Sequence, residues 1–452
     1  MNLLKSSLSF ILILLLTTSL KAQVDKPLSL EKDLHTYLEV IHEVKGFSGE
    51  ILVAQDGEIL FQEASGLMSV EHETEMQVGA NYRIASITKT FTGALITIAH
   101  DEQKLNLNDK VVTYVPGLSD TFDDITIYQL LKHTSGVPHN EGIKNYWLEI
   151  SKLPLNRQQA IEEFNKLDLL FEPGTRMHYS SLGYYLLALV LENVYDSSFQ
   201  DILSKNILTP LKMTDTGVLR NQQIIPGMTS GYHLVSDDSL LVAPYRNYSL
   251  LKGAGDMHST SNDLLKWGNS FLDTKLIDEE VRKMIFTPDH GYGLGWYIDH
   301  SELEKYYHGG TTWGYSSFIS IYPESGAVII LLSNVSTLPM ESISIDVEKI
   351  VHGLPFEMPT PKKAISAESL DPDFYEGTFI SDSGKMKLRI SSQQNRLLAQ
   401  LLGNPAFEIY PLGHHTFFGK KVEIEIRFIV EENIIKGLEA ERMGQTFNFK
   451  KL

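Results

Sequence analysis

The chain has 452 residues, long enough for two or more domains, and 42% of them are hydrophobic, which excludes a globally disordered protein. It contains no cysteine, which excludes a thiol nucleophile, thiolate metal ligands and disulfide bonds. The formal net charge of −18 argues against a nucleic-acid partner, because nucleic-acid binding needs a basic surface.

The first 22 residues have the pattern of a signal peptide. Lys5 precedes an apolar run over residues 8–16, which is too short to span a bilayer and is followed by small and polar residues. Ala22 is the expected cleavage point, and an uncleaved anchor is the alternative. No later segment is long and apolar enough to cross a membrane. We therefore expect an exported protein, periplasmic or secreted, with no membrane span after cleavage.

Hydrophobic periodicity predicts one large domain over residues 23–353. An amphipathic helix over 29–44 is followed by two strands, 49–54 and 59–64, joined by a hairpin turn at Asp56-Gly57. Because strands lie at both ends and helices between them, we predict an α+β fold: an antiparallel sheet closed by the two terminal segments and flanked by helices. The other expected elements are helices over 86–100 and 181–194, helices that begin at a Thr126–Gln129 capping box and after Thr260, and strands over 315–322 and 327–333.

The composition changes after residue 353. Pro355, Pro359 and Pro361 mark a linker over 354–369. Residues 370–452 hold short apolar runs separated by turn signals, which predict a small antiparallel barrel or sandwich with a filled interior. The runs cover residues 377–380, 385–390, 397–401, 407–410, 422–430, 434–440 and 446–449.

The first candidate for chemistry is Ser86-Ile-Thr-Lys89, at the start of an apolar helix. The spacing places the two side chains on one helical face. Burial and a helix N-terminus both lower the pKa of a lysine, so a neutral Lys89 amine can take the hydroxyl proton of Ser86 and make it a nucleophile. The Ser86 N–H could also donate to an oxyanion. The alternative for this short pattern alone is an N-cap serine beside a lysine that reaches solvent.

The second candidate is Tyr179-Ser180-Ser181, between a turn and the buried helix. A tyrosine at such a junction can reach into a cleft. Next to a lysine cation its phenol could ionise and shuttle a proton. The alternative is a tyrosine that covers the edge of the core.

The third candidate is His308-Gly309-Gly310-Thr311, which precedes a predicted strand. Glycines let the backbone of a strand approach a ligand closely. The Thr311 N–H could be a second oxyanion donor, and His308 could hold a carboxylate or a proton. The alternative is a glycine-rich turn before a strand.

In this order and at this spacing, the three segments resemble the class C β-lactamase-related serine hydrolases, which are grouped with penicillin-binding proteins and D-aminopeptidases. The flanks Leu130–Gly136, Pro173–Ser180, Gly253–Thr260 and Gly291–Trp296 are also similar to that family. The tail resembles the small lipocalin-like domain that is appended to some of these hydrolases.

The resemblance implies acyl transfer through a Ser86 acyl-enzyme, at a site where sheet and helices meet, without a metal or a cofactor. Lys89 and Tyr179 would move the proton to the leaving group and later activate water. The N–H groups of Ser86 and Thr311 would hold the oxyanion. The residues that would bind the substrate, a small molecule or a peptide, are Ser181, His308, Gly309 and Gly310.

Two positions depart from the family pattern. Ser181 stands where the family often has the asparagine of Tyr-x-Asn, and His308 stands where it has the lysine of Lys-Thr-Gly. A neutral histidine holds a β-lactam carboxylate less strongly than a lysine does. We therefore expect an exported serine hydrolase that cleaves an ester, an amide or a D-amino-acid peptide. The alternatives are a D-Ala-D-Ala carboxypeptidase or weak β-lactamase, and a catalytically silent binding module; the sequence leaves the substrate and the oligomeric state open.

Overall fold

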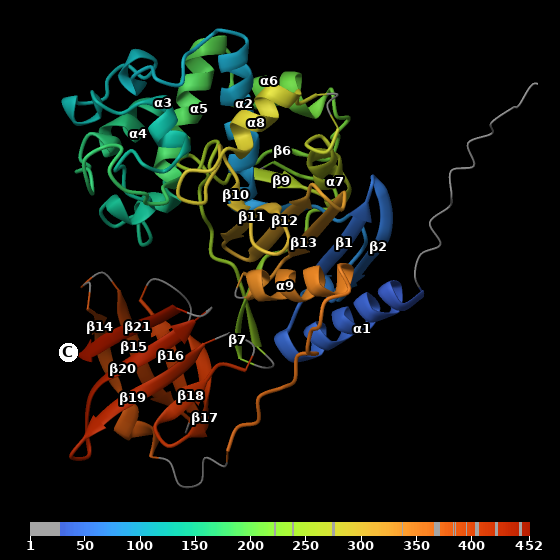
Figure 1. Ribbon diagram of the computed structural model, residues 1–452. Helices are drawn as coiled ribbons and strands as arrows, with labels where there is room; N and C mark the ends of the chain where they lie inside the picture. Colours follow the sequence, from blue (N-terminus) through green and yellow to red (C-terminus); the bar gives the residue numbers. More distant parts are fainter. Residues whose placement is uncertain are drawn as a thin grey trace, which may run out of the picture.

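The computed structural model describes residues 28–452 except 221–222, 237–238, 274–275, 337, 366–370, 383, 385, 395, 403–405, 421–423 and 443–444. The predicted signal peptide lies outside the described residues. Figure 1 shows a large body of sheet and helices followed by a separate barrel. Within the described part of the chain, no helix combines the length and the apolar character needed to cross a membrane.

The centre of the large body is a six-stranded antiparallel sheet in the order β10-β11-β12-β13-β1-β2. The N-terminal hairpin joins the C-terminal strands, with Gly49 opposite Ser333, so the predicted closure by the two terminal segments is confirmed. The hairpin turns at Asp56 and Gly57, which both have positive φ as a two-residue turn requires. The strands are β1 (Gly49–Gln55), β2 (Glu58–Ser65), β10 (Tyr297–Asp299), β11 (Lys305–Thr312), β12 (Tyr315–Tyr322) and β13 (Ala327–Ser333).

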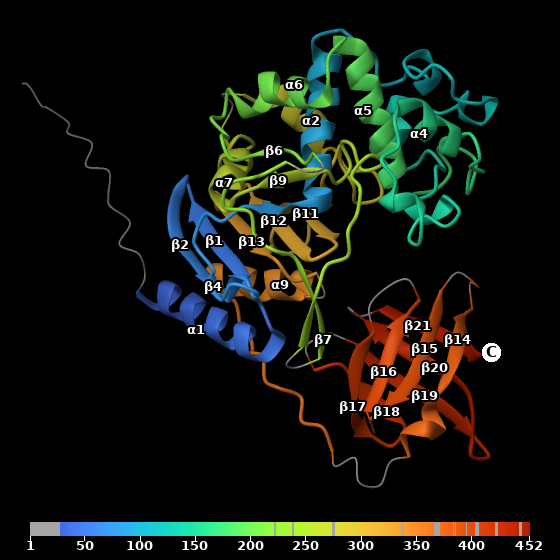
Figure 2. The same ribbon diagram turned by 180° about the vertical axis from the view of Figure 1, so that it is seen from behind.

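Every residue of β12 and β13 is buried, because helices cover both faces of the sheet. Alternate side chains enter two different cores, so Ile319 and Ile330 pack on one side while Phe318 and Leu331 pack on the other. Figure 2 shows α1 and α9 together at one face and α2 and α5 beyond the other. The helices are α1 (Leu28–Lys45), α2 (Thr88–Asp101), α5 (Ser181–Tyr195), α7 (Ser261–Asn269) and α9 (Met340–Val351).

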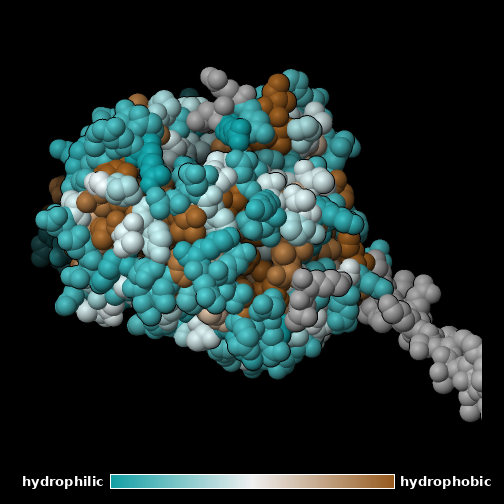
Figure 3. All heavy atoms as spheres, turned by 90° about the horizontal axis from the view of Figure 1, so that it is seen from above, coloured by the Kyte–Doolittle hydropathy of each residue, from teal (hydrophilic) through white to brown (hydrophobic). Residues whose placement is uncertain are grey.

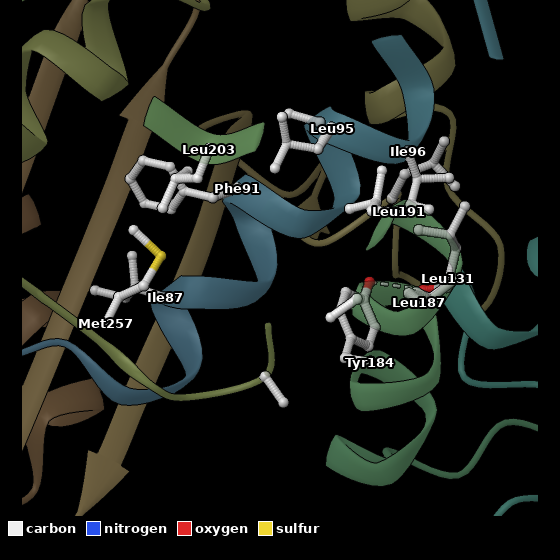
Figure 4. Packing of buried hydrophobic residues seen from close by; sticks show 14 of the residues in the cluster. Ile87, Phe91, Leu95, Ile96, Leu131, Tyr184, Leu187, Leu191, Leu203 and Met257 are labelled. Atoms are coloured by element: carbon white, nitrogen blue, oxygen red, sulfur yellow. Dashed lines mark hydrogen bonds between the residues drawn. The ribbon is translucent and has the colours of Figure 1, made fainter. Parts of the chain in front are cut away.

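Helix α2 lies in the centre of the larger core. Phe91 points toward Leu203, whereas Ile96 points toward Leu191 on the other side of the helix (Figure 4). Trp267 of α7 stacks on Phe91 at 4.3 Å between ring centroids. Packing on several sides holds the N-terminal end of α2 in place, and that end carries Ser86 and Lys89.

Two predicted helix starts are confirmed. Thr126 and Gln129 form both hydrogen bonds of a capping box, and Thr260 caps α7 by accepting from the Asp263 N–H at 3.2 Å. The other helices are α3 (Ile127–Leu131), α4 (Arg157–Phe164), α6 (Phe199–Leu203) and α8 (Glu279–Phe286). The smaller strands are β3 (Leu67–Ser69), β4 (Thr74–Glu75), β5 (Tyr82–Arg83), β6 (Gly217–Val218), β7 (Tyr232–Ser236), β8 (Ser239–Val242) and β9 (Met257–Ser259).

The tail is a closed antiparallel barrel in which β14 also pairs with β21. The sequence predicted seven of its strands and missed β18 (Thr416–Phe418), which is only three residues long and follows the polar pair His414-His415. The barrel lies beside β7 (Figures 1 and 2), and the Ile365 N–H after α9 donates to Pro411 O at 2.9 Å. The other barrel strands are β14 (Gly377–Ser381), β15 (Lys387–Gln393), β16 (Arg396–Leu401), β17 (Phe407–Gly413), β19 (Glu425–Glu431), β20 (Ile434–Arg442) and β21 (Gln445–Lys451).

The face of the molecule seen from above is mostly polar. In the view of Figure 3, hydrophilic residues cover most of the visible face, and hydrophobic residues form separate patches between them. This distribution is ordinary for a folded protein surface, and no single apolar patch on this face marks a binding site.

Candidate active site

Ser86 lies where an extended segment turns into helix α2. The chain leaves β5, passes through a 3₁₀ turn over Ala85–Ile87 and continues as α2 from Thr88. Ala85 has φ +46°, a left-handed conformation that costs energy for a residue with a side chain. The predicted helix therefore begins with a tight turn, which leaves Ser86 half-buried at the junction between sheet and helices.

The Lys89 ammonium group is enclosed. Its Nζ lies 3.1 Å from Ser86 Oγ, 3.1 Å from Ser181 Oγ and 2.6 Å from the carbonyl oxygen of Ala254. Burial lowers its pKa well below the usual lysine value. A neutral amine that donates to Ala254 and Ser181 keeps its lone pair for the Ser86 hydroxyl proton. The geometry is that of a lysine general base beside a serine.

Tyr179 is the third side chain of this group, beside Ser86 and Lys89. Its hydroxyl is hydrogen-bonded with Ser86, and the Lys89 Nζ lies 4.9 Å from the centre of its ring. Burial raises the pKa of Tyr179 well above its usual value and outweighs the opposite effect of the Ser86 hydrogen bond. The structure thus favours a neutral phenol, unlike the sequence-based expectation of an ionising one, and Lys89 is the better proton acceptor of the two.

Two histidines position the Tyr179-Ser180-Ser181 segment. The Ser180 N–H donates to His133 Nδ1 and the Ser181 N–H donates to His139 Nδ1, both at 3.0 Å. An accepting Nδ1 requires a neutral imidazole, and burial lowers the pKa of His139 to about 3. The roles of His133 and His139 are not visible in the sequence, because a contact across more than 40 residues leaves no local pattern.

Gly310 lets strand β11 lie against the Ser86 turn. A Cβ atom at Gly310 would lie 2.5 Å from Ile84 O and 2.9 Å from Ser86 N, so a larger residue would force the strand away. The Ser317 hydroxyl on the paired strand donates to Ile84 O at 2.8 Å and fastens the two segments together. Thr311 follows directly, which brings the two expected oxyanion donors onto adjoining segments; their role stays a prediction.

His308 is buried and fully hydrogen-bonded. Its Nδ1 lies 2.6 Å from Gly309 O, so that nitrogen carries the proton, and Nε2 accepts from the Tyr292 hydroxyl at 3.2 Å. Burial, together with Lys89, lowers the pKa of His308 to about 3. A neutral imidazole with both nitrogens occupied has no N–H left for a substrate carboxylate, which is one of the two roles that the sequence suggested for it.

Asp256 is a further buried charge near the site. Its carboxylate accepts from the Gly253 N–H at 2.9 Å and closes the loop that presents Ala254 O to Lys89. Burial raises the pKa of Asp256 to about 7, and its charge opposes the effect of burial on the Lys89 pKa. In the sequence, this loop is recognisable only as the flank Gly253–Thr260, which is similar to the family.

Two of the three predicted segments, those of Tyr179 and His308, line a cavity of about 460 Å³, a normal size for a small-molecule site. Ser86 is not among the lining residues, but its side chain is hydrogen-bonded with Tyr179, which lines the cavity. Tyr179 and Thr311 face it together with apolar residues of β12 and the start of α9. Among the described residues, no group of three or more His, Cys, Asp or Glu is placed to hold a metal ion. The lining residues are Tyr179, Tyr297, Tyr307, His308, Gly309, Gly310, Thr311, Ser317, Phe318, Ser336, Leu338, Met340 and Glu341.

Comparisons with known proteins agree with this geometry. The model of the family described as Beta-lactamase matches residues 40–348. Penicillin-binding protein 4* of Bacillus subtilis (strain 168) is 27% identical over 432 residues, which cover 90% of this chain and 95% of that protein. The octameric penicillin-binding protein homologue from Pyrococcus abyssi has a similar structure, with a TM-score of 0.63, 20% identity, and coverage of 93% of this chain and 99% of that one. D-amino acid amidase from Ochrobactrum anthropi SV3 superposes with a TM-score of 0.62, 22% identity and coverage of 71% and 99%.

Proposed function

Because the chain belongs to the beta-lactamase family, we propose that it is an exported serine hydrolase that cleaves an ester, an amide or a D-amino-acid peptide through an acyl-enzyme on Ser86. The observation that carries the proposal is the position of the Lys89 amine, which is buried, low in pKa and 3.1 Å from Ser86 Oγ. Export is supported by the apolar run over residues 8–16, which lies outside the described residues.

The reaction begins with proton transfer from the Ser86 hydroxyl to Lys89 Nζ as Oγ attacks the carbonyl carbon. The N–H groups of Ser86 and Thr311 stabilise the resulting oxyanion. When the tetrahedral intermediate collapses, the bond to the leaving group breaks. The proton then passes from Lys89 to the nitrogen or oxygen atom of the leaving group. Tyr179, which is hydrogen-bonded with Ser86, relays it. Water then loses a proton to Lys89 and attacks the acyl-enzyme, which releases the acid and restores the Ser86 hydroxyl.

The test is covalent labelling of Ser86 with a fluorophosphonate ester, followed by intact mass. We expect a single adduct on the wild-type protein and none on Ser86→Ala, with the circular dichroism spectra of the two proteins superimposable. Absence of the adduct on folded wild-type protein would contradict the proposed nucleophile and leave a silent binding module as the better description.

Penicillin provides a second arm for the same measurement, because penicillin-binding protein 4* is among the relatives. A lasting penicilloyl adduct would favour an enzyme that acts on cell-wall peptides. The neutral, fully hydrogen-bonded His308 argues against it, since it offers no donor to the penicillin carboxylate. We expect labelling by the uncharged fluorophosphonate to exceed labelling by penicillin.

A further inference from the structure

The direction in which a substrate would lie across Ser86 follows from the proposed reaction. The attacked carbonyl carbon carries an oxygen, a leaving group and an acyl group. The N–H groups of Ser86 and Thr311 hold the oxygen, and Tyr179 passes the proton to the leaving atom. Tyr179 also lines the cavity, together with residues 307–311 of β11. The leaving group therefore lies on the cavity side, and the acyl group extends the other way, toward the end of β11 and Trp313.

A contact between two tryptophans lies in that direction. Trp313 follows Thr311 by two residues, in the turn between β11 and β12. Its ring centroid lies 5.1 Å from that of Trp147, with 55° between the ring planes. Trp147 follows His139 in the chain, and His139 accepts the Ser181 N–H on the helical side of the site. The two tryptophans therefore join the sheet to the helical side, beyond the acyl end of the site.

Arg246 fixes this contact from beneath. Its side chain is buried, and the carbon of its guanidinium group lies 3.7 Å from the centre of the Trp313 ring. The same group donates to the carbonyl oxygen of Trp147 at 2.6 Å and to the Ser151 hydroxyl. The Asn247 N–H also donates to Ser151 O at 2.9 Å, which ties the two segments together at a second point. The tryptophan contact is thus a fixed part of the fold.

The length of β11 between Ser86 and the tryptophans sets the space for an acyl group. A Cβ atom at Gly310 would lie 2.9 Å from Ser86 N, so Gly310 is directly beside the nucleophile. Trp313 is three residues farther along, which corresponds to about 10 Å of extended strand. An extended chain advances by about 1.2 Å per bond, and the Trp313 ring occupies part of this distance. An acyl chain of about six carbons fills the remaining space.

We propose that Trp147 and Trp313 limit the acyl group of the substrate, so that the enzyme acts on esters or amides of short or compact acids. A longer chain would have to displace two rings that Arg246 holds in place, which is costly in a packed contact. Larger groups are accepted on the leaving-group side, where the cavity measures about 460 Å³. This inference rests on the proposed function, since it requires an acyl-enzyme on Ser86.

The test measures the labelling of Ser86 by alkanesulfonyl fluorides in the full-length protein, with intact mass as the readout. Ser86 Oγ bonds to sulfur, its proton passes to Lys89, and fluoride leaves as the S–F bond breaks. The sulfur carries one alkyl chain, which must take the place of the acyl group. We expect butanesulfonyl fluoride to label Ser86 faster than decanesulfonyl fluoride by about tenfold or more.

The ratio of the two labelling rates separates a limit on chain length from a structural role. Trp147→Ala and Trp313→Ala should raise the decyl-to-butyl ratio by about tenfold, whereas Trp147→Phe should keep it low. Arg246→Lys keeps the charge but loses the planar contact with Trp313, so its ratio should lie between the two. The matched control is Leu148→Ala, which removes an exposed apolar neighbour of Trp147 and should leave the ratio unchanged. Damage to the fold would slow both reagents equally.

Equal rates for the two sulfonyl fluorides in the wild-type protein, or an unchanged ratio in both alanine variants, would overturn the inference, while a fluorophosphonate adduct on Ser86 still supported the proposed function. Failure of butanesulfonyl fluoride on protein that the fluorophosphonate labels would also overturn it, because the butyl chain fits the space described. Absence of the fluorophosphonate adduct on folded protein would overturn both the inference and the proposed function.

Discussion

The central sheet and the C-terminal barrel bury their side chains in different ways. Every residue of β12 is buried, whereas β15 alternates between exposed and buried positions at its start. The sheet needs helices on both faces, and these helices bring Lys89 and Ser181 together across 92 residues. The barrel closes on itself, and its interior is filled by apolar side chains such as Phe379 and Leu438.

The difference also concerns charge. The large body buries Lys89, Lys132 and Asp256, while no charged side chain is buried among the described residues of the barrel. Buried charges are costly unless they are paired or hydrogen-bonded, and of these three Lys89 is the one that lies 3.1 Å from Ser86 Oγ. The large body, which the family model matches over residues 40–348, therefore holds the candidate site, and the barrel has a packed apolar interior.

The largest effect should come from Lys89. We expect Lys89→Met to slow fluorophosphonate labelling of Ser86 by about 10³-fold or more, because the general base is lost. The matched control is Lys132→Met, which removes another buried lysine, one that donates to Tyr292 O at 3.0 Å and does not contact Ser86. If both variants lost labelling equally, the cause would be the removal of a buried lysine in general and not the loss of the base at Ser86.

A smaller effect is expected where β11 approaches Ser86. Gly310→Ala places a methyl group against Ile84 O and Ser86 N, which should move the strand and reduce the labelling rate by about 10²-fold. The same change at Gly309 meets its nearest atom at 3.6 Å and should cost far less. Time courses of the adduct by intact mass distinguish the two, and equal rates would mean that the strand tolerates displacement.

The pH dependence of the rate of Ser86 labelling should depend on the charge of Asp256. Reactivity should rise with pH as Lys89 loses its proton, and the Asp256 charge raises the Lys89 pKa. Asp256→Asn keeps an oxygen for the Gly253 N–H but removes that charge, so the rise should shift to lower pH. Because the pKa of Asp256 is about 7, the difference from wild type should be clearest above pH 7, where Asp256 is ionised. A shift to higher pH would contradict this assignment.

We expect the smallest effect on the labelling of Ser86 from a substitution in the barrel. Phe379→Ala removes a side chain that is fully buried in the barrel and should lower the free energy of unfolding of that domain by about 3–5 kcal/mol. Labelling of Ser86 at a temperature where the barrel remains folded should stay within about twofold of wild type. Parallel thermal unfolding and labelling measure both, and a large loss of labelling would mean that the barrel takes part in the site.

Local patterns were sufficient for most of the elements. The periodicity over 181–194, the Asp56-Gly57 turn and the Thr126–Gln129 capping box depend on residues that are close in the chain, and each is present in the structure. The short strand β18 was missed because three residues do not establish an alternation. The burial of α5 was likewise predictable from the sequence, since a helix that is apolar all round must be buried.

By itself, the sequence determined the nucleophile candidate, the α+β fold and the separate tail, because these follow from spacing, composition and a family resemblance. Only the tertiary structure decided the protonation states and the charge of the cavity. The neutral His308 and the histidines behind Tyr179 depend on burial and on contacts between distant segments. A pKa and a binding preference are properties of an environment, and that environment exists only after the chain has folded.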